Sequence, residues 1–369
     1  MSGDTLSVIL PLVKIAEKEG ADEVEFYALS RNTNRVDYEN SSLKSASASR
    51  AQGVGIRVLA NKSLGFASAN SFDREKILEA LKDAISIAKT TPSMDHYYLS
   101  PPRKIKHIKN LYDEGTASLS MSQTIEYGKD LLKQISDADS RVSVESGQLS
   151  SNVDEYAIAT STGIESSEMR TALSWYIFGW AVDGSIIGSM DLEFDSVVAA
   201  NDMDLGSGAK MFVEKVIKNL GAEKSDAFRG EAIFSPEASQ DLFDMLMTST
   251  KSTAIQSGSS FLQDKLGEKI AISDLTITDD GTHPGIATNS SFDREGIPRA
   301  PLNIIDSGVF KAVLYNTFTA NKDELVSTGH ASGGFRAAPN IGTTYTEIQQ
   351  GAKSFDEMVS EIDKGLYIQ

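Results

Sequence analysis

A segment dense in glycine, aspartate and proline separates two apolar runs in the last third of the chain. It contains Asp279-Asp280-Gly281-Thr282-His283-Pro284-Gly285 and, after a short polar run, Phe292-Asp293-Arg294-Glu295-Gly296-Ile297-Pro298. Ile277-Thr278 precede it and Leu302-Asn303-Ile304-Ile305 follow, so we expect a long ordered loop that leaves one strand and enters the next. By residue type alone, such a loop is more often a connector than a functional site.

The first third of the chain predicts a helix, an antiparallel meander and a second helix. Apolar residues at helical spacing from Leu6, closed by Gly20, indicate the first helix, with Pro11 marking its first turn. Short runs separated by Asn, Ser and Gly indicate strands at 24–29, 34–39, 53–59 and 65–68. A one-sided apolar pattern indicates a helix at 73–89.

The middle of the chain predicts mainly strands. A helix at 122–135 precedes strands at 141–147, 154–160, 165–178 and 189–198, with glycines at the turns, namely Gly147, Gly163 and Gly184. A helix at 209–220 closes this region.

Helix caps mark the last third. Ser235 is expected as an N-cap with Pro236 at the first helical position, and this helix is expected to run towards Ser257. Ser354 and Glu357 fit a capping box for a final helix that ends near residue 365. The run 366–369 looks like the start of a strand, which predicts a sheet that is incomplete or completed by another chain.

Together these patterns predict an α+β fold. We expect an N-terminal helix and antiparallel-sheet unit at 1–113, including a linker from about 91, a β-rich central domain at 114–225, and a mixed C-terminal domain at 226–369 with a large antiparallel sheet.

Composition excludes several functional classes. The formal net charge of -17 opposes direct nucleic-acid binding, which needs clustered Lys and Arg. No apolar run approaches the ~20 residues that span a bilayer, and the N-terminus shows no signal-peptide pattern, so we expect a cytoplasmic protein that is not bound to membranes. With 0 Cys, disulfides, thiolate metal sites and a Cys nucleophile are excluded.

Several motifs in order resemble those of the TldD/PmbA family, which includes zinc metallopeptidases and the once-named modulator of DNA gyrase. The resemblance covers nearly the whole chain, and each motif is weak alone. The matching motifs are Gly53-Val54-Gly55-Ile56-Arg57-Val58 with Gly65-Phe66-Ala67, Ser235-Pro236-Glu237-Ala238, the two parts of the 279–298 segment, Ser327-Thr328-Gly329-His330-Ala331, Pro339-Asn340 and Lys364-Gly365-Leu366-Tyr367.

The resemblance implies that this chain lacks the family's zinc site. In TldD-type members, the helix after Ser-Pro-Glu-Ala carries a zinc-binding His-Glu-x-x-x-His motif, whose Glu is the general base. Those positions fall on Asp244, Met245 and Ser249 here. His283 and His330 lie in matched motifs, but we expect neither a metal site nor a catalytic residue in this chain.

The resemblance therefore implies a PmbA (TldE)-type chain. Such a chain is expected to be the non-metal subunit of a heteromeric metalloprotease, needing no cofactor of its own, whose TldD-type partner supplies zinc and cleaves unfolded or precursor peptides. It is expected to help enclose the substrate and to hold extended peptide by strand addition. Asp280, His283, Arg294 and His330 are candidate substrate contacts, and a structural role in their turns is the equal alternative.

Two other functions stay open. A metal-independent hydrolase would use Asp280, His283 or His330 for acid–base chemistry, although no local spacing defines a nucleophile. A non-enzymatic homodimer would bind peptides or regulate a partner. Family members usually continue past the Gly-Leu-Tyr strand with further β structure, so the chain is expected to be a short or trimmed member.

Overall fold

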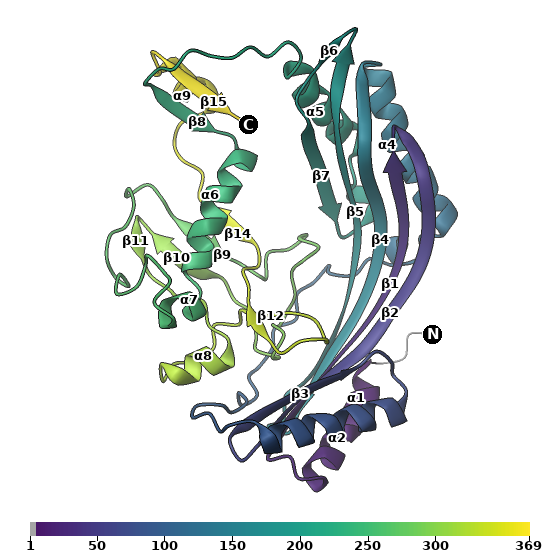
Figure 1. Cartoon of the computed structure of the whole chain (residues 1–369), viewed down its shortest axis with the longest axis vertical. Coiled ribbons are helices and arrows are strands. Elements are labelled where there is room, and N and C mark those ends of the chain that lie inside the picture. Colours follow the sequence, from purple (N-terminus) through teal and green to yellow (C-terminus); the bar gives the residue numbers. More distant parts are fainter. Residues whose placement is uncertain (1–4) are drawn as a thin grey trace.

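The computed structural model describes residues 5–369, and its elements confirm the α+β class. Its largest part is a curled antiparallel sheet, to which residues before 114 and after 114 both contribute (Figure 1). The strands in order across this sheet are β3 (Ser63–Ala69), β2 (Ser42–Ala60), β1 (Glu23–Glu39), β4 (Val142–Thr160) and β5 (Glu165–Asp183), and β5 also pairs with β6 (Ile186–Ile187) and β7 (Asp191–Val197). The expected domain boundaries stay a prediction.

Several strands are longer than the sequence patterns predicted. β1 covers both 24–29 and 34–39, and β4 covers the expected strand at 141–147 from residue 142 on, together with 154–160. The polar residues between those runs have partners across the strand pair, because Arg31 binds the Asp154 carboxylate through two bonds of 2.6 Å and the Thr33 hydroxyl donates to Asn152 at 2.7 Å. Because these polar side chains have hydrogen-bond partners on the neighbouring strand, β1 and β4 continue through them.

Gly147 lies inside β4, so the prediction of a turn at this residue is wrong. A Cβ there would approach the Tyr176 carbonyl oxygen to 2.6 Å, so the glycine permits close strand packing. Pro11 likewise lies inside the first helix and not in its first turn, because that helix begins at Thr5.

Helices cover one face of the large sheet in two groups. The first group packs on β1 to β3 around Phe26 and Ile56, and the second packs on β4, β5 and β7 around Leu149 and Phe212. These helices are α1 (Thr5–Lys18) and α2 (Arg74–Thr90) in the first group, α4 (Met121–Ala138) and α5 (Leu205–Lys218) in the second, with the short α3 (Glu114–Ala117) and η1 (Ala200–Asp202) nearby. Among residues 5–369, no helix has the length and apolarity to cross a membrane.

The last third forms smaller sheets and short helices. A four-stranded antiparallel sheet has the order β11 (Val309–Phe310), β10 (Leu302–Asp306), β9 (Ile277–Asp279) and β14 (Thr346–Ile348). The other elements are β8 (Glu231–Phe234), which pairs in parallel with β15 (Gly365–Ile368), β12 (Ala331–Ser332) with β13 (Asn340–Ile341), and the helices α6 (Pro236–Ser249), α7 (Ser252–Gln256), α8 (Thr317–Lys322) and α9 (Phe355–Ser360).

Both predicted caps are confirmed, whereas both helix ends were placed too late. The Ser235 hydroxyl accepts the Ala238 N–H, and Ser354 forms the capping box with Glu357. α6 ends at Ser249 because the chain turns after it and starts a separate helix at residue 252, and α9 ends at residue 360.

The C-terminal segment packs on the sheet face opposite the helices. Phe292, Ile297 and Phe335 form a buried cluster with Tyr27 and Tyr156, which project from β1 and β4 on that face. In Figure 1 the green and yellow C-terminal elements lie on the concave side of the sheet. This contact brings the 279–298 segment against strands that are far away in sequence.

Candidate functional site

The segment from Asp279 to Pro298 is an ordered loop between β9 and β10, as predicted. It is not a surface connector, because every residue from Asn289 to Ile297 is buried. A buried loop needs partners for its backbone groups. The following contacts show how the loop obtains them.

Asp293 organises the turn. One carboxylate oxygen accepts the Glu295 and Ile297 N–H groups at 2.8 and 2.9 Å, and the other accepts the Ala331 N–H at 2.9 Å. Burial, with the negative charge of Glu295 second, raises the pKa of the Asp293 carboxyl. Asp293 therefore satisfies backbone donors from two segments that lie 38 residues apart.

Two carboxylates and two guanidinium groups form a buried ion network between this loop and the large sheet. Arg57 donates to Glu295 at 2.7 Å and to Glu25, and Arg294 donates to Glu25 at 2.7 Å. The Arg294 guanidinium also stacks on the Tyr27 ring, 3.9 Å from its centroid. Burial alone would raise the pKa of Glu25, but the two arginines outweigh it and lower that pKa.

This network gives Arg294 a structural role, and substrate contact by Arg294 stays a prediction. The residue is only 3 % exposed, and its guanidinium pairs with Glu25 and stacks on the Tyr27 ring. Sequence reasoning missed Glu25 and Arg57, which supply the sheet side of the network. A charged residue inside each apolar strand run, Val24-Glu25-Phe26 and Ile56-Arg57-Val58, was the available signal.

His330 is also buried, at 2 % exposure, and belongs to a second polar cluster. Its Nε2 lies 3.2 Å from the Asp279 carboxylate and its Nδ1 lies 2.9 Å from the Thr328 hydroxyl. Asp279 also accepts the Thr344 N–H and hydroxyl and the Thr346 hydroxyl. Burial acts to raise the pKa of Asp279, but hydrogen bonds and charge, first from His330, lower it overall. The cluster ties β9 to the chain leading into β14.

Asp280 and His283 lie nearer the surface. The Asp280 carboxylate accepts the Thr282 N–H at 2.9 Å and its hydroxyl at 2.6 Å, which is an Asx-type turn. The His283 ring packs on the Tyr345 ring, with 4.8 Å between the ring centroids, and its Nδ1 lies 3.0 Å from the Pro284 carbonyl oxygen. The structure thus divides the four predicted contacts into two buried residues and two partly exposed ones, and substrate contact by any of the four stays a prediction.

The tip of this loop borders a groove. Pro284 and Gly285 line a cavity of about 550 Å³ together with the end of β7 and the 110–113 segment. The loop tip therefore forms one wall of this cavity, and a role of the loop in a substrate chamber stays a prediction.

A second groove of about 480 Å³ lies between α6 and β14. Its lining residues are Pro236, Gln240, Phe243, Asp244, Met247, Thr343, Thr344, Thr346 and Ile348. The strand β14 is at the edge of its sheet, since it pairs with β9 on one side and with no other strand among residues 5–369. The groove therefore runs beside a strand with one free edge.

The donors on α6 do not fit zinc. Asp244 lines the groove, but the Met245 side chain is 63 % exposed, and the Ser249 hydroxyl donates to the Met245 carbonyl oxygen at 3.0 Å. Zinc sites use three or four Cys, His or carboxylate ligands. Over residues 5–369, no group of three or more such side chains is placed to hold a metal ion.

Three family models match successive parts of the chain. They describe domain 1, the central domain and the C-terminal domain of the PmbA/TldA metallopeptidases, and they match residues 24–88, 114–220 and 229–369. The chain belongs to the PmbA/TldD family.

Known members of the PmbA/TldD family are similar to this chain over most of its length. A protein of Methanothermobacter thermautotrophicus named metalloprotease is 26% identical over 378 residues, covering 94% of this chain and 77% of its own length. The crystal structure of TldE from Thermococcus kodakarensis matches with a TM-score of 0.88 and 25% identity, covering 97% of this chain and 81% of that one. A Thermotoga maritima structure described as a candidate modulator of a DNA gyrase shares the fold, with a TM-score of 0.83 at 21% identity, covering 95% of this chain and 79% of that one.

Proposed function

We propose that this chain is a cytoplasmic, non-metal subunit of a heteromeric metalloprotease, in which a TldD-type partner supplies the zinc and cleaves the peptide. The proposal is supported by the donor set on α6, where the family resemblance puts Asp244, Met245 and Ser249 at the positions of the zinc motif. Family membership gives the peptidase context, and these side chains leave the chain without its own metal chemistry.

In this proposal the chain holds the extended substrate in the groove between α6 and β14. A peptide that adds to the free edge of β14 gains backbone hydrogen bonds that do not depend on its sequence. Gln240 and Asp244 line the groove from the helix, and Thr346 lines it from the strand. Such recognition suits unfolded or precursor peptides, whose backbone groups are free.

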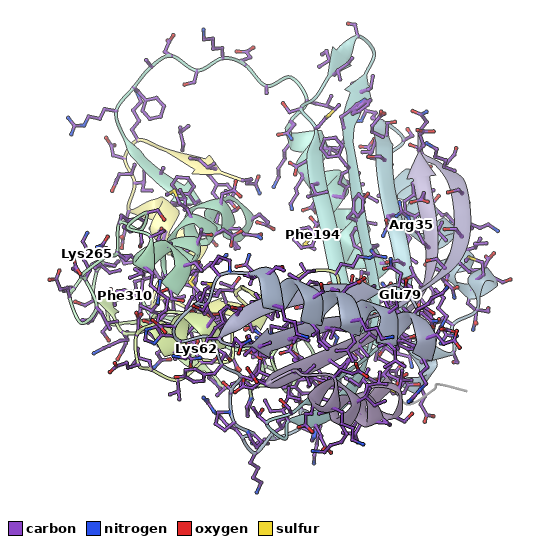
Figure 2. The ribbon with its side chains drawn as sticks, turned by 60° about the horizontal axis from the view of Figure 1, so that its bottom comes forward. Arg35, Lys62, Glu79, Phe194, Lys265 and Phe310 are labelled. Atoms are coloured by element: carbon purple, nitrogen blue, oxygen red, sulfur yellow. The ribbon has the colours of Figure 1, made fainter. Side chains whose placement is uncertain are left out.

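Exposed apolar side chains near β7 support an oligomer. Ile187, Met190, Leu192 and Phe194 are between 44 and 68 % exposed. Glu193 binds Lys215 of α5 at 2.7 Å, so its neighbour Phe194 projects from the opposite, helix-free face (Figure 2). Large apolar patches on soluble proteins usually mark interaction sites, and we assign this one to the TldD-type partner.

Cleavage assays on the mixture of both subunits test this role. The chain is mixed with the His-Glu-x-x-x-His paralogue from the same genome, and cleavage of a casein-derived peptide is followed. We expect Gln240→Trp, which fills the groove, to raise KM at least tenfold. Asp241→Trp is the matched control, because Asp241 is exposed on the same helix and does not line the groove.

An unchanged KM in Gln240→Trp would show that the substrate does not bind in the groove between α6 and β14. Full cleavage by the paralogue alone, with no effect of adding this chain, would contradict the heteromeric role itself. In that case a stable homodimer that still binds peptide would establish the non-enzymatic alternative.

A further inference from the structure

The outer edge of β2 is free along much of its length. β3 pairs with β2 only from Val54 to Ala60, whereas β1 pairs with β2 from Ser42 onward. Over residues 5–369, no strand pairs with the 42–53 part of β2 on its outer side. In Figure 1 this part of β2 extends past β3 along the border of the sheet.

The register shows which backbone groups this edge offers. The Ser161 N–H donates to the Val24 carbonyl. The backbone N–H and C=O groups of even-numbered residues of β1 therefore point to β4, and those of odd-numbered residues point to β2. Odd-numbered residues of β1 lie opposite odd-numbered residues of β2 in this part of the pair. The N–H and C=O groups of Ala46, Ala48 and Arg50 therefore point to the free side.

Small side chains leave this edge accessible from both faces. The run Ser45-Ala46-Ser47-Ala48-Ser49 is exposed throughout. Proline, bulges and inward charges usually protect free edges. This run has no proline and no charged residue, and the bulge of β2 lies just before it, at Lys44. Antiparallel self-pairing centred on Ser47 would place Lys44 opposite Arg50 of a second copy, and that like-charge pair opposes a homodimer through this edge.

A cationic pocket lies where the free edge stops. Arg50, Ala51, Gln52, Asn70 and Arg336 line a cavity of about 480 Å³, and no carboxylate lines it. The Arg50 side chain has no hydrogen-bond or ion-pair partner among residues 5–369, and Arg336 donates through Nε to Asn70 at 3.0 Å. In a chain with a net charge of -17, two guanidinium groups around one cavity favour an anion.

Strand order limits how a peptide on this edge can reach the pocket. β3 occupies the edge from Val54 onward, with Ala69 opposite Val54, so a peptide added along residues 42–53 must end or turn at the pocket. A peptide parallel to β2 brings its C-terminal carboxylate there, whereas an antiparallel peptide brings its amino group towards two arginines. Arg binds carboxylates through paired N–H donors.

We propose that the free edge of β2 binds an extended peptide parallel to β2, with its C-terminal carboxylate held by Arg50 and Arg336. This second peptide site is separate from the α6–β14 groove and does not depend on it. Arg35 of β1, labelled in Figure 2, lies opposite Ser47 and marks the middle of the edge.

Fluorescence anisotropy with two probes tests this site. The probes are an N-terminally labelled octapeptide of alternating Thr and Ser with a free carboxylate, and the same peptide amidated. We expect the free acid to bind roughly 10- to 100-fold more tightly, the range for charge-assisted hydrogen bonds. Arg50→Glu should abolish that preference, while Arg229→Glu, the same charge change at an exposed arginine after α5, should preserve it.

Two further variants separate the parts of the site. Ala48→Pro removes an outward N–H without taking a bond from β1, so it should weaken both probes equally while thermal unfolding confirms the fold. Gln240→Trp in the α6–β14 groove should leave the preference unchanged. Equal binding of acid and amide by the native chain, or a preference that survives Arg50→Glu, would overturn the proposal.

Discussion

Replacing Glu25 by glutamine should open the contact between the 289–297 loop and the large sheet. The native carboxylate binds Arg57 and Arg294, and all three residues are at most 3 % exposed. The substitution keeps the shape but leaves two buried guanidinium groups with less compensating charge. Removing one partner of a buried pair costs about 3–5 kcal/mol, which corresponds to a roughly 150- to 5,000-fold larger open population.

Hydrogen exchange measured by mass spectrometry reports that opening directly. The Arg294 N–H donates to Ala331 and the Ile297 N–H donates to Asp293, so both amides are protected only while the loop is docked. Lys129→Gln is the control, because its exposed pair with Glu126 contributes about 0.5 kcal/mol at most. A less than tenfold change in Glu25→Gln, or one equal to the control, would refute the reasoning.

Three further substitutions test the same region by urea or thermal unfolding. Gly296→Ala should destabilise by about 1–3 kcal/mol, because Gly296 has φ +76° and a Cβ would lie 2.5 Å from the Ile164 side chain, whereas Gly334→Ala, with nothing within 4 Å, should be nearly neutral. Asp279→Asn should cost about 1.5–3 kcal/mol at pH 7. The folded state lowers the pKa of Asp279. The difference in free energy of unfolding between the native chain and Asp279→Asn should therefore be largest above about pH 4 and disappear as the pH falls further. Ser235→Ala should cost about 1 kcal/mol through the lost α6 cap. Equal effects of the two glycine changes, a pH-independent Asp279→Asn difference, or a neutral Ser235→Ala would contradict these assignments.

Local patterns in the sequence predicted the elements whose causes are local. The N-cap at Ser235 and the capping box at Ser354 depend on residues within three positions, and both are confirmed. The loop between β9 and β10 was also predicted, because its glycines and prolines interrupt both helix and strand patterns.

Partners that are distant in sequence explain what the patterns missed. Arg31 looked like part of a break, but Asp154 pairs with it across the sheet and β1 continues. The pairing of Arg294 with Glu25, 269 residues away, could not be predicted either, because the fold alone brings the two residues together. The free edge of β2 and its pocket were equally invisible, because strand order and the approach of Arg336 are set by tertiary packing.

The metal content of the purified subunits, measured by inductively coupled plasma mass spectrometry together with casein cleavage, tests whether this chain is the non-metal subunit. This chain is measured alone and then in complex with its His-Glu-x-x-x-His paralogue. We expect no stoichiometric zinc and no cleavage for the chain alone, and chelator-sensitive cleavage with zinc in the complex. Stoichiometric zinc and chelator-sensitive cleavage by the chain alone would contradict this expectation.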